Sequence, residues 1–209
     1  MDDFPLLSTK LHIPPVRQDV VSRSRLVERL DKGLDTRLTL ISAPAGFGKT
    51  TVLSEWIHQK QIRVGWYSID PSDNDPLQFF AYLLAGLQQI QEGIGESILY
   101  MLRSPRHPPL KSLLLNLMNE LDTVQAACAL VLDDYHVIEN NQIHALLEAM
   151  LEHLPEQVHL YVASRADPPI SLARLRSQRQ ITEIRVDELS FTRKEAAAFF
   201  HRMLSRELS

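Results

Sequence analysis

Cysteine is almost absent from this chain, since Cys128 is the only one among 209 residues. A single thiol cannot form an internal disulfide, so no part of the fold depends on one. Cys128 stands in an apolar run that ends at Asp133, which favours a small buried side chain over a nucleophile. The eight histidines show none of the paired spacing that holds zinc, so we expect no zinc site.

Long apolar runs and an excess of positive charge are missing as well. No uninterrupted apolar run approaches the roughly 18 residues that a membrane-spanning helix needs. The acidic start, Met1-Asp2-Asp3-Phe4, lacks the apolar core of a secretion signal, so we expect a cytoplasmic protein. The net charge of −4 gives no global electrostatic case for binding nucleic acid. With 44% hydrophobic and 23% charged residues, the chain suits one α/β domain.

The most informative segment is a short loop between a predicted strand and a predicted helix. It follows the apolar run Leu38–Ser42 and reads Ala43-Pro44-Ala45-Gly46-Phe47-Gly48-Lys49-Thr50-Thr51. The pattern A-x-x-x-x-G-K-T is that of a phosphate-binding loop in which alanine replaces the first glycine. Backbone N–H groups of such a loop surround phosphates at the start of the next helix. We predict that Lys49 contacts the β- and γ-phosphates and that the Thr50 hydroxyl ligates Mg²⁺.

Two carboxylates, Asp133 and Asp134, directly follow a second apolar run, Ala129–Leu132. In phosphate-loop ATPases the first such acid holds Mg²⁺, partly through water, and an acid beside it orients the attacking water. We predict these roles for Asp133 and Asp134, which together with Lys49 form the predicted catalytic group. The alternative is a pair of solvated acids in a turn.

Apolar runs alternate with helical periodicities from residue 36 to residue 186, as in a parallel sheet covered by helices. The runs predict five strands: Leu38–Ser42, Val64–Ile69, Ala129–Leu132, Leu160–Ala163 and Ile181–Val186. Helices are predicted after Asp75-Pro76, over 110–121 and over 143–154, with a loop over 104–109. The predicted fold class is α/β, a P-loop NTPase three-layer sandwich with a five-stranded, mostly parallel sheet.

A capping box at Thr192 and Glu195 predicts the start of another helix near the end of the sequence. Phe199, Phe200 and Met203 fall on one face of this helix. An apolar face of this kind suits docking onto a following lid domain better than entry into a DNA groove. We therefore expect the start of a helical lid here.

Several segments, taken in order, resemble one protein family. Besides the phosphate loop they are Lys10-Leu11, Val21-Ser22-Arg23, Gly65-Trp66-Tyr67-Ser68-Ile69-Asp70, Asp133-Asp134-Tyr135-His136, Ala163-Ser164-Arg165 and Phe191-Thr192. Together they resemble the nucleotide-binding domain, of the NB-ARC or STAND type, of MalT-like, ATP-dependent LuxR-family transcriptional regulators. The resemblance covers nearly the whole chain and implies that ATP or ADP is the bound cofactor, with Mg²⁺.

The resemblance also implies roles for residues outside the phosphate loop. Val21 and Arg23 match an element placed beside the adenine, the valine through its backbone and the arginine near the phosphates or an inter-domain interface. Arg165 matches a sensor arginine that contacts the γ-phosphate and so distinguishes ATP from ADP, a role that suits a planar guanidinium. The plainer alternative is that these are structural residues at a helix start and a strand end.

The resemblance further implies a division of the chain and a set of partners. Residues 1–35 would form an adenine-side arm and helix, 36–190 the ATPase core, and 191–209 the first helix of a helical or winged-helix module. Relatives of this kind continue with a lid, a sensor domain that binds an inducer, and a helix-turn-helix, none of which is in this sequence. We expect no direct DNA binding and no membrane association by this chain, and we expect nucleotide-dependent self-association.

The leading hypothesis is an ATP-binding switch with slow Mg²⁺-dependent hydrolysis of ATP to ADP and phosphate. One alternative is a kinase that acts on a small molecule, with Arg174, Arg176 and Arg179 as a conceivable lid group. Another is a mechanical P-loop ATPase, which needs an arginine finger supplied in trans. GTP is disfavoured because the chain has no N-K-x-D sequence for reading guanine.

Overall fold

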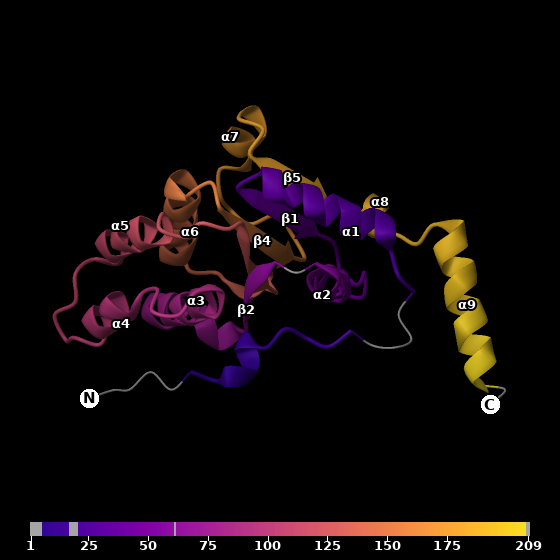
Figure 1. Cartoon of the computed structure of the whole chain (residues 1–209), viewed down its shortest axis with the longest axis horizontal. Helices are drawn as coiled ribbons and strands as arrows, with labels where there is room; N and C mark the ends of the chain where they lie inside the picture. The colour runs from indigo at the N-terminus through magenta and orange to yellow at the C-terminus, as the bar shows by residue number, and fades with distance from the viewer. Residues whose placement is uncertain (1–5, 17–20, 61, 208–209) are drawn as a thin grey trace.

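The computed structural model has one central parallel sheet with helices packed on both of its faces (Figure 1). It describes residues 6–16, 21–60 and 62–207, with side chains up to His201. The strands are β1 (Leu38–Ser42), β2 (Arg63–Ser68), β3 (Cys128–Asp133), β4 (Val158–Ser164) and β5 (Ile181–Ile184). They pair in the order β2-β3-β4-β1-β5, and every pair is parallel, so the predicted fold class is confirmed.

Successive side chains of each strand enter two different cores, because side chains alternate across a strand. In β3, Leu130 and Leu132 belong to one core, whereas Ala129 and Val131 belong to the other. The central strand β3 therefore reads as a continuous apolar run up to Asp133, as expected for a parallel sheet buried on both faces, whereas the edge strand β5 alternates between half-buried and buried residues. The two cores define the two helical layers of the sandwich.

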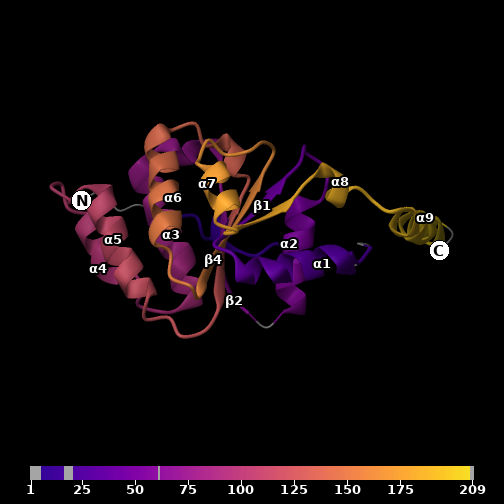
Figure 2. The same cartoon turned by 90° about the horizontal axis from the view of Figure 1, so that it is seen from above.

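The larger core lies under α3 (Pro76–Ile90), α4 (Glu96–Leu102), α5 (Leu110–Leu121), α6 (Asn141–His153) and α7 (Leu172–Ser177). The smaller core lies under α1 (Ser24–Asp31), α2 (Lys49–Gln59) and α8 (Val186–Leu189). Figure 2 shows the sheet from above, with α3 to α6 on one side and α1 and α2 on the other. The helix that follows the phosphate loop therefore belongs to the smaller layer.

Two of the predicted helices, α3 and α6, begin directly after a residue whose side chain caps them. The Asp75 carboxylate accepts the backbone N–H groups of Leu77 and Gln78, and Pro76 is the first helical residue of α3. The Asn140 side chain caps α6 in the same manner by accepting from Gln142. Both contacts satisfy N–H groups that the first turn of a helix leaves without partners.

The prediction for the last strand was wrong at its end. β5 stops at Ile184, two residues earlier than expected, and Val186 begins the short helix α8. The Glu188 carboxylate accepts the Arg185 N–H at 3.3 Å and so closes a helical turn where an extended strand was predicted. The remaining short elements, which were not predicted, are η1 (Ser8–Leu11), η2 (Lys32–Asp35), η3 (Pro71–Asn74) and η4 (Tyr135–Val137).

The helix predicted from the capping box is α9 (Arg193–Glu207). The Thr192 N–H donates to the Glu195 carboxylate at 2.8 Å, and the Glu195 N–H donates back to the Thr192 hydroxyl at 3.2 Å. Figure 1 shows α9 at the side of the sandwich, beyond α8. Phe200 is exposed on this helix, whereas the side chain of Met203 lies outside the described residues. The division of the chain into three parts stays a prediction.

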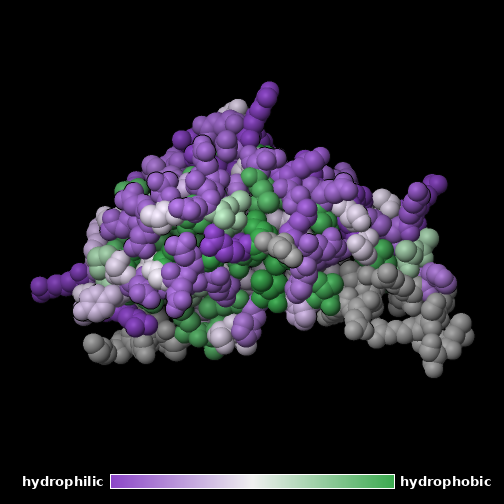
Figure 3. Space-filling model, in the orientation of Figure 1, coloured by the Kyte–Doolittle hydropathy of each residue, from purple (hydrophilic) through white to green (hydrophobic). Residues whose placement is uncertain are grey.

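The face drawn in Figure 3 is largely hydrophilic, with hydrophobic residues gathered near its middle. The most exposed large hydrophobic side chains are those of Tyr100, Phe200 and Leu7. None of the helices in the described part of the chain is both long enough and apolar enough to span a membrane.

The contact between β2 and α3 depends on two glycines. A Cβ atom on Gly65 would lie 2.1 Å from the backbone oxygen of Gly86, which belongs to the helix and is not free to move away. We expect Gly65→Ala to lower the free energy of unfolding by about 2 kcal/mol or more, as overpacked core sites do. Urea unfolding measures this difference.

The matched control is Gly86→Ala, whose Cβ would lie 3.1 Å from the flexible end of Leu130 and in ordinary contact, at 3.7 Å, with the backbone oxygen of Trp66. Alanine also favours a helix over glycine by about 1 kcal/mol. Gly86→Ala should therefore leave the stability within about 1 kcal/mol of the original chain. Equal losses for the two variants would contradict the close backbone contact.

Candidate nucleotide-binding site

The predicted phosphate loop lies at the carboxyl end of β1, where the ends of β3 and β4 also lie. Gly46 and Gly48 have φ angles of 86° and 76°, a left-handed backbone that glycine adopts without strain. α2 begins at the next residue, so the first N–H groups of this helix face the loop. Ala43, which stands in place of the usual glycine, is buried and donates its N–H to the Ser164 carbonyl at 3.2 Å.

The Lys49 ammonium lies inside the loop. It donates to the carbonyl oxygens of Ala43 and Pro44 at 2.7 and 3.1 Å. Burial lowers the pKa of Lys49, and the positive charge of Arg165 acts in the same direction, whereas Asp134 and Asp133 oppose it. A buried cation surrounded by backbone oxygens is well placed to receive an anionic ligand.

The pair predicted to hold Mg²⁺ is in direct contact, although its members are 83 positions apart in the sequence. The Thr50 hydroxyl donates to Asp133 Oδ2 at 2.8 Å. Burial raises the pKa of Asp133 to about 6, because nothing nearby fully compensates its charge. A hydroxyl and a buried carboxylate are hard oxygen ligands, so these residues fit Mg²⁺.

The protein alone offers few further ligands for such an ion. In residues 6–16, 21–60 and 62–207, no group of three or more His, Cys, Asp or Glu side chains could hold a metal. A Mg²⁺ ion beside Thr50 and Asp133 would take its remaining ligands from phosphate oxygens and water, as is usual for this ion.

Asp134 and Arg165 lie at the same edge of the sheet as Lys49. Asp134 adopts a left-handed backbone with φ of 58° and keeps its side chain about half exposed. His136 Nδ1 is 3.7 Å from Asp134 Oδ1, and burial, followed by the charge of Arg165, lowers the pKa of His136. Arg165 is exposed, and its charge acts on both His136 and Lys49. The sequence did not single out His136.

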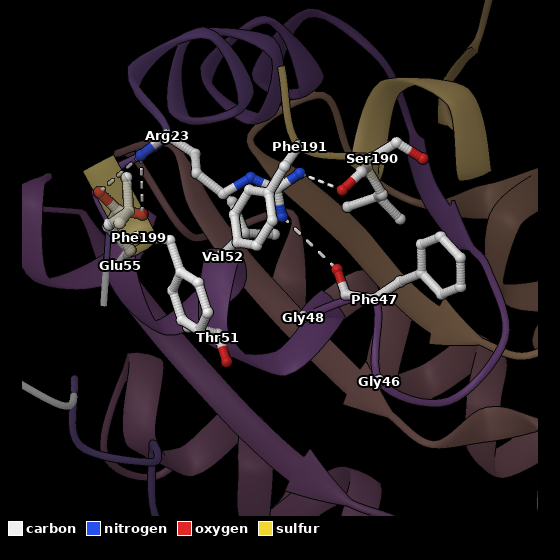
Figure 4. Close-up of a pocket in the computed structure, with 12 residues that line it drawn as sticks. Arg23, Gly46, Phe47, Gly48, Thr51, Val52, Glu55, Ser190, Phe191 and Phe199 are labelled. Carbon is white, nitrogen blue, oxygen red and sulfur yellow. Dashed lines mark hydrogen bonds between the residues drawn. The ribbon is translucent and has the colours of Figure 1, made fainter. Parts of the chain in front are cut away.

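A cavity of about 600 Å³ opens beside the phosphate loop (Figure 4). Its lining includes six of the predicted nucleotide-binding residues: Val21, Arg23, Gly46, Phe47, Gly48 and Thr51. Six others were not predicted as part of a site: Val52, Glu55, Leu189, Ser190, Phe191 and Phe199. Ala45 lies in the exposed part of the loop and is not among the lining residues. The roles of all these residues stay predictions.

Arg23 forms one wall of this cavity. Its guanidinium donates to the carbonyl oxygen of Leu189 and approaches the Phe47 carbonyl at 3.5 Å. It also lies over the ring of Phe191, with 5.0 Å between the guanidinium carbon and the ring centroid. Burial lowers the pKa of Arg23, whose Nε atom is buried without a hydrogen-bond partner. The side chain thus joins the phosphate loop to the segment after β5.

Arg25 holds the same segment from the outside. Its guanidinium forms a two-pronged pair with the Glu195 carboxylate, at 3.0 and 2.9 Å. It also donates to the backbone oxygens of Glu188 and Ser190. Paired geometry of this kind fixes both groups more firmly than a single ion pair does. Hydrogen bonds from Arg23 and Arg25 therefore hold residues 188–195 against the cavity.

Most of the cavity residues that were not predicted from the sequence lie in or just after residues 188–195. Phe191 stacks on Phe199 with 5.7 Å between ring centroids, so both rings meet at the mouth of the cavity. An aromatic residue directly before the capping box at Thr192 was a usable signal for this arrangement. Two of the three arginines considered for a kinase lid are in ion pairs, since Arg174 pairs with Glu152 and Arg176 with Glu183.

Asp133 is expected to destabilise the protein when no cation is bound. Its pKa of about 6 in the folded state lies above the ordinary 3.8, so ionisation opposes folding at pH 7.5 by at most about 3 kcal/mol. Asp133→Asn should therefore raise the free energy of unfolding in EDTA by about 1 kcal/mol. The gain should fade as the pH falls from about 6 to about 4, and it should be absent below about pH 3, where the carboxyl is protonated in both states. Urea unfolding across this pH range would contradict the assignment if the variant were less stable at pH 7.5.

Comparison with known proteins gives long matches to one kind of regulator. Over 203 residues, 97% of this chain, it is 39% identical to the HTH-type transcriptional regulator MalT of Cronobacter sakazakii. It is 38% identical over 195 residues to the MalT of Serratia proteamaculans. In both cases the chain spans only 22% of the relative's length. The predicted resemblance to the nucleotide-binding region of MalT-like regulators is thereby confirmed.

A solved structure and a family model agree on the fold. The crystal structure of Cdc6p from Pyrobaculum aerophilum superposes with a TM-score of 0.54 at 15% identity, covering 86% of this chain and 49% of that one. At this identity the likeness speaks for the fold alone. The model of the AAA domain family matches residues 33–182, which contain the phosphate loop and the strand that ends at Asp133. The chain belongs to the AAA domain family of P-loop NTPases.

Proposed function

We propose that this domain is an ATP-binding switch that hydrolyses ATP slowly and whose ATP or ADP state controls a transcriptional regulator. The observation that carries the proposal is the contact of Thr50 with Asp133 beside a loop that encloses the Lys49 ammonium. The hydroxyl and the carboxylate would hold Mg²⁺ on a bound triphosphate, and the ammonium would turn from the loop carbonyls to the phosphates. The adjoining cavity of about 600 Å³ is of a size suited to a nucleoside.

Nucleotide binding would use the loop, the start of α2 and the cavity together. The N–H groups around Gly46 and Gly48 bind phosphate oxygens, and Lys49 leaves the Ala43 and Pro44 carbonyls to contact the β- and γ-phosphates. Thr50 and Asp133 would hold Mg²⁺, which would neutralise part of the phosphate charge when bound. Val21 and Arg23 border the space left for the base and ribose.

Hydrolysis would depend on residues at the edge that faces the γ-phosphate. The Asp134 carboxylate accepts a hydrogen bond from the attacking water and orients its oxygen toward phosphorus. Arg165, exposed at the end of β4, donates to γ-phosphate oxygens and is released when that phosphate leaves. The loss of this contact distinguishes the ADP state from the ATP state.

The relatives suggest the kind of protein in which this switch domain acts. They are transcriptional regulators of which this chain matches about a fifth, so we propose that sensing and DNA readout belong to parts outside these residues. The proposed location is the cytoplasm. The domain itself is proposed not to contact DNA directly, and ATP binding is proposed to favour association with further copies.

Lys49→Ala tests the proposal most directly. Removal of the ammonium should weaken Mg²⁺·ATP binding by about a hundredfold or more, since charge-assisted contacts to phosphate are lost. Lys60→Ala is the matched control, because Lys60 directly follows the same helix and pairs with Asp31 on the surface. Isothermal titration should show normal binding by the control. ATP binding by Lys49→Ala at full affinity would refute the site.

Arg165→Ala tests the discrimination between nucleotides. Because only ATP offers a third phosphate, the variant should lose about tenfold in affinity for a non-hydrolysable ATP analogue and less than about twofold for ADP. Arg174→Ala, which removes another exposed arginine, should change neither affinity. Equal losses for both nucleotides would exclude a sensor role.

Asp134→Asn separates hydrolysis from binding. The variant keeps the shape of the side chain and removes the charge that would orient water, so ATP affinity should change little. Phosphate release should fall by about a hundredfold, within the range for removal of a general base. The exposed Asp187→Asn serves as the control. Unchanged phosphate release by Asp134→Asn would leave Asp134 as a structural residue of the turn.

A further inference from the structure

Glu55 is a buried acid on α2 that none of the roles above uses. Its side chain borders the cavity, and the residue is only 5% exposed. It stands on the same helix as Lys49 and Thr50, and therefore belongs to the element that carries the phosphate site. A carboxylate is costly to bury unless hydrogen bonds compensate its charge.

The donors that compensate Glu55 come mainly from residues 21–23, which we call the base strap. Glu55 Oε1 accepts the Ser22 hydroxyl at 2.5 Å, and the Arg23 N–H lies 3.3 and 3.4 Å from the two carboxylate oxygens. Figure 4 shows the contacts from the Arg23 backbone to Glu55. One further donor, the Gln59 side-chain amide, comes from α2 itself, at 3.0 Å.

The base strap is also bonded to α1, because the Arg23 carbonyl oxygen accepts the N–H groups of Leu26 and Val27 at 2.7 and 3.2 Å. Arg23 is the N-cap residue of α1, and its side chain makes no cap hydrogen bond to that helix. Its guanidinium instead extends across the cavity to Leu189. The contact with Glu55 therefore joins the strap, together with the start of α1, to α2 and so to the phosphate loop.

We infer that Glu55 is the positioning residue for the base side of the nucleotide site. By holding the Ser22 hydroxyl and the Arg23 N–H, it sets the width of the cavity between the strap and α2. Its loss should weaken the binding of the base and ribose while the phosphate site on the same helix stays intact. This inference rests on the proposed function, since it concerns the same nucleotide.

The test compares two probes, ADP and inorganic tripolyphosphate, each with Mg²⁺ and titrated by calorimetry into the full chain. Tripolyphosphate occupies only the phosphate site. Glu55→Ala should weaken ADP binding by about tenfold and tripolyphosphate binding by less than about twofold. Glu55→Gln keeps one acceptor oxygen for the strap, so it should restore most of the ADP affinity. Gln59→Ala removes only the donor from α2 and should match the original chain.

The outcomes separate the inference from the proposed function. Equal losses for both probes, or an unchanged ADP affinity, would overturn the positioning role and leave the phosphate site in place. Binding of neither probe by the original chain would overturn the proposed function, and the inference with it. If Glu55→Ala does not fold, Ser22→Ala removes the hydroxyl partner from an exposed residue. It should lower ADP affinity by about threefold without changing tripolyphosphate binding, and equal effects on both would refute the role.

Discussion

Parallel pairing of all five strands is the constraint on which the rest of this molecule depends. Strands that run the same way present all their carboxyl ends at one edge, so the residues after β1, β3 and β4 must meet there. Lys49, Asp133 and Arg165 are far apart in the sequence and share this edge for that reason. The helices that reverse the chain between strands cover both faces, and this explains the two separate cores.

The sequence predicted this edge well because its signals are local. The apolar run into the phosphate loop and the run into Asp133 each place a polar group at the end of a strand. The parallel topology then places these two strand ends at the same edge of the sheet, and the Thr50 hydroxyl lies 2.8 Å from Asp133 Oδ2. The end of β5 was mispredicted because the contact that ends it, from Arg185 to Glu188, outweighs the β-propensity of Val186.

The cavity was harder to predict, because no single segment specifies it. Its walls come from the base strap, from α2 and from residues 189–199, and these approach one another only after the sheet has formed. Phe191 and Phe199 read in sequence as an apolar patch around a helix start. In the sequence, nothing distinguishes Glu55 from a surface acid of an amphipathic helix. Their place in the site depends on contacts that span more than 30 residues for Glu55 and more than 160 for Leu189.

The pair between Arg25 and Glu195 joins residues separated by 170 positions. Closing a loop of that length costs conformational entropy before the contact is gained, and such long-range contacts are typically late in folding. The cavity that residues 188–195 border is therefore complete only when almost the whole domain has folded. A ligand held there binds the finished domain and not its parts, so its binding energy stabilises the global fold.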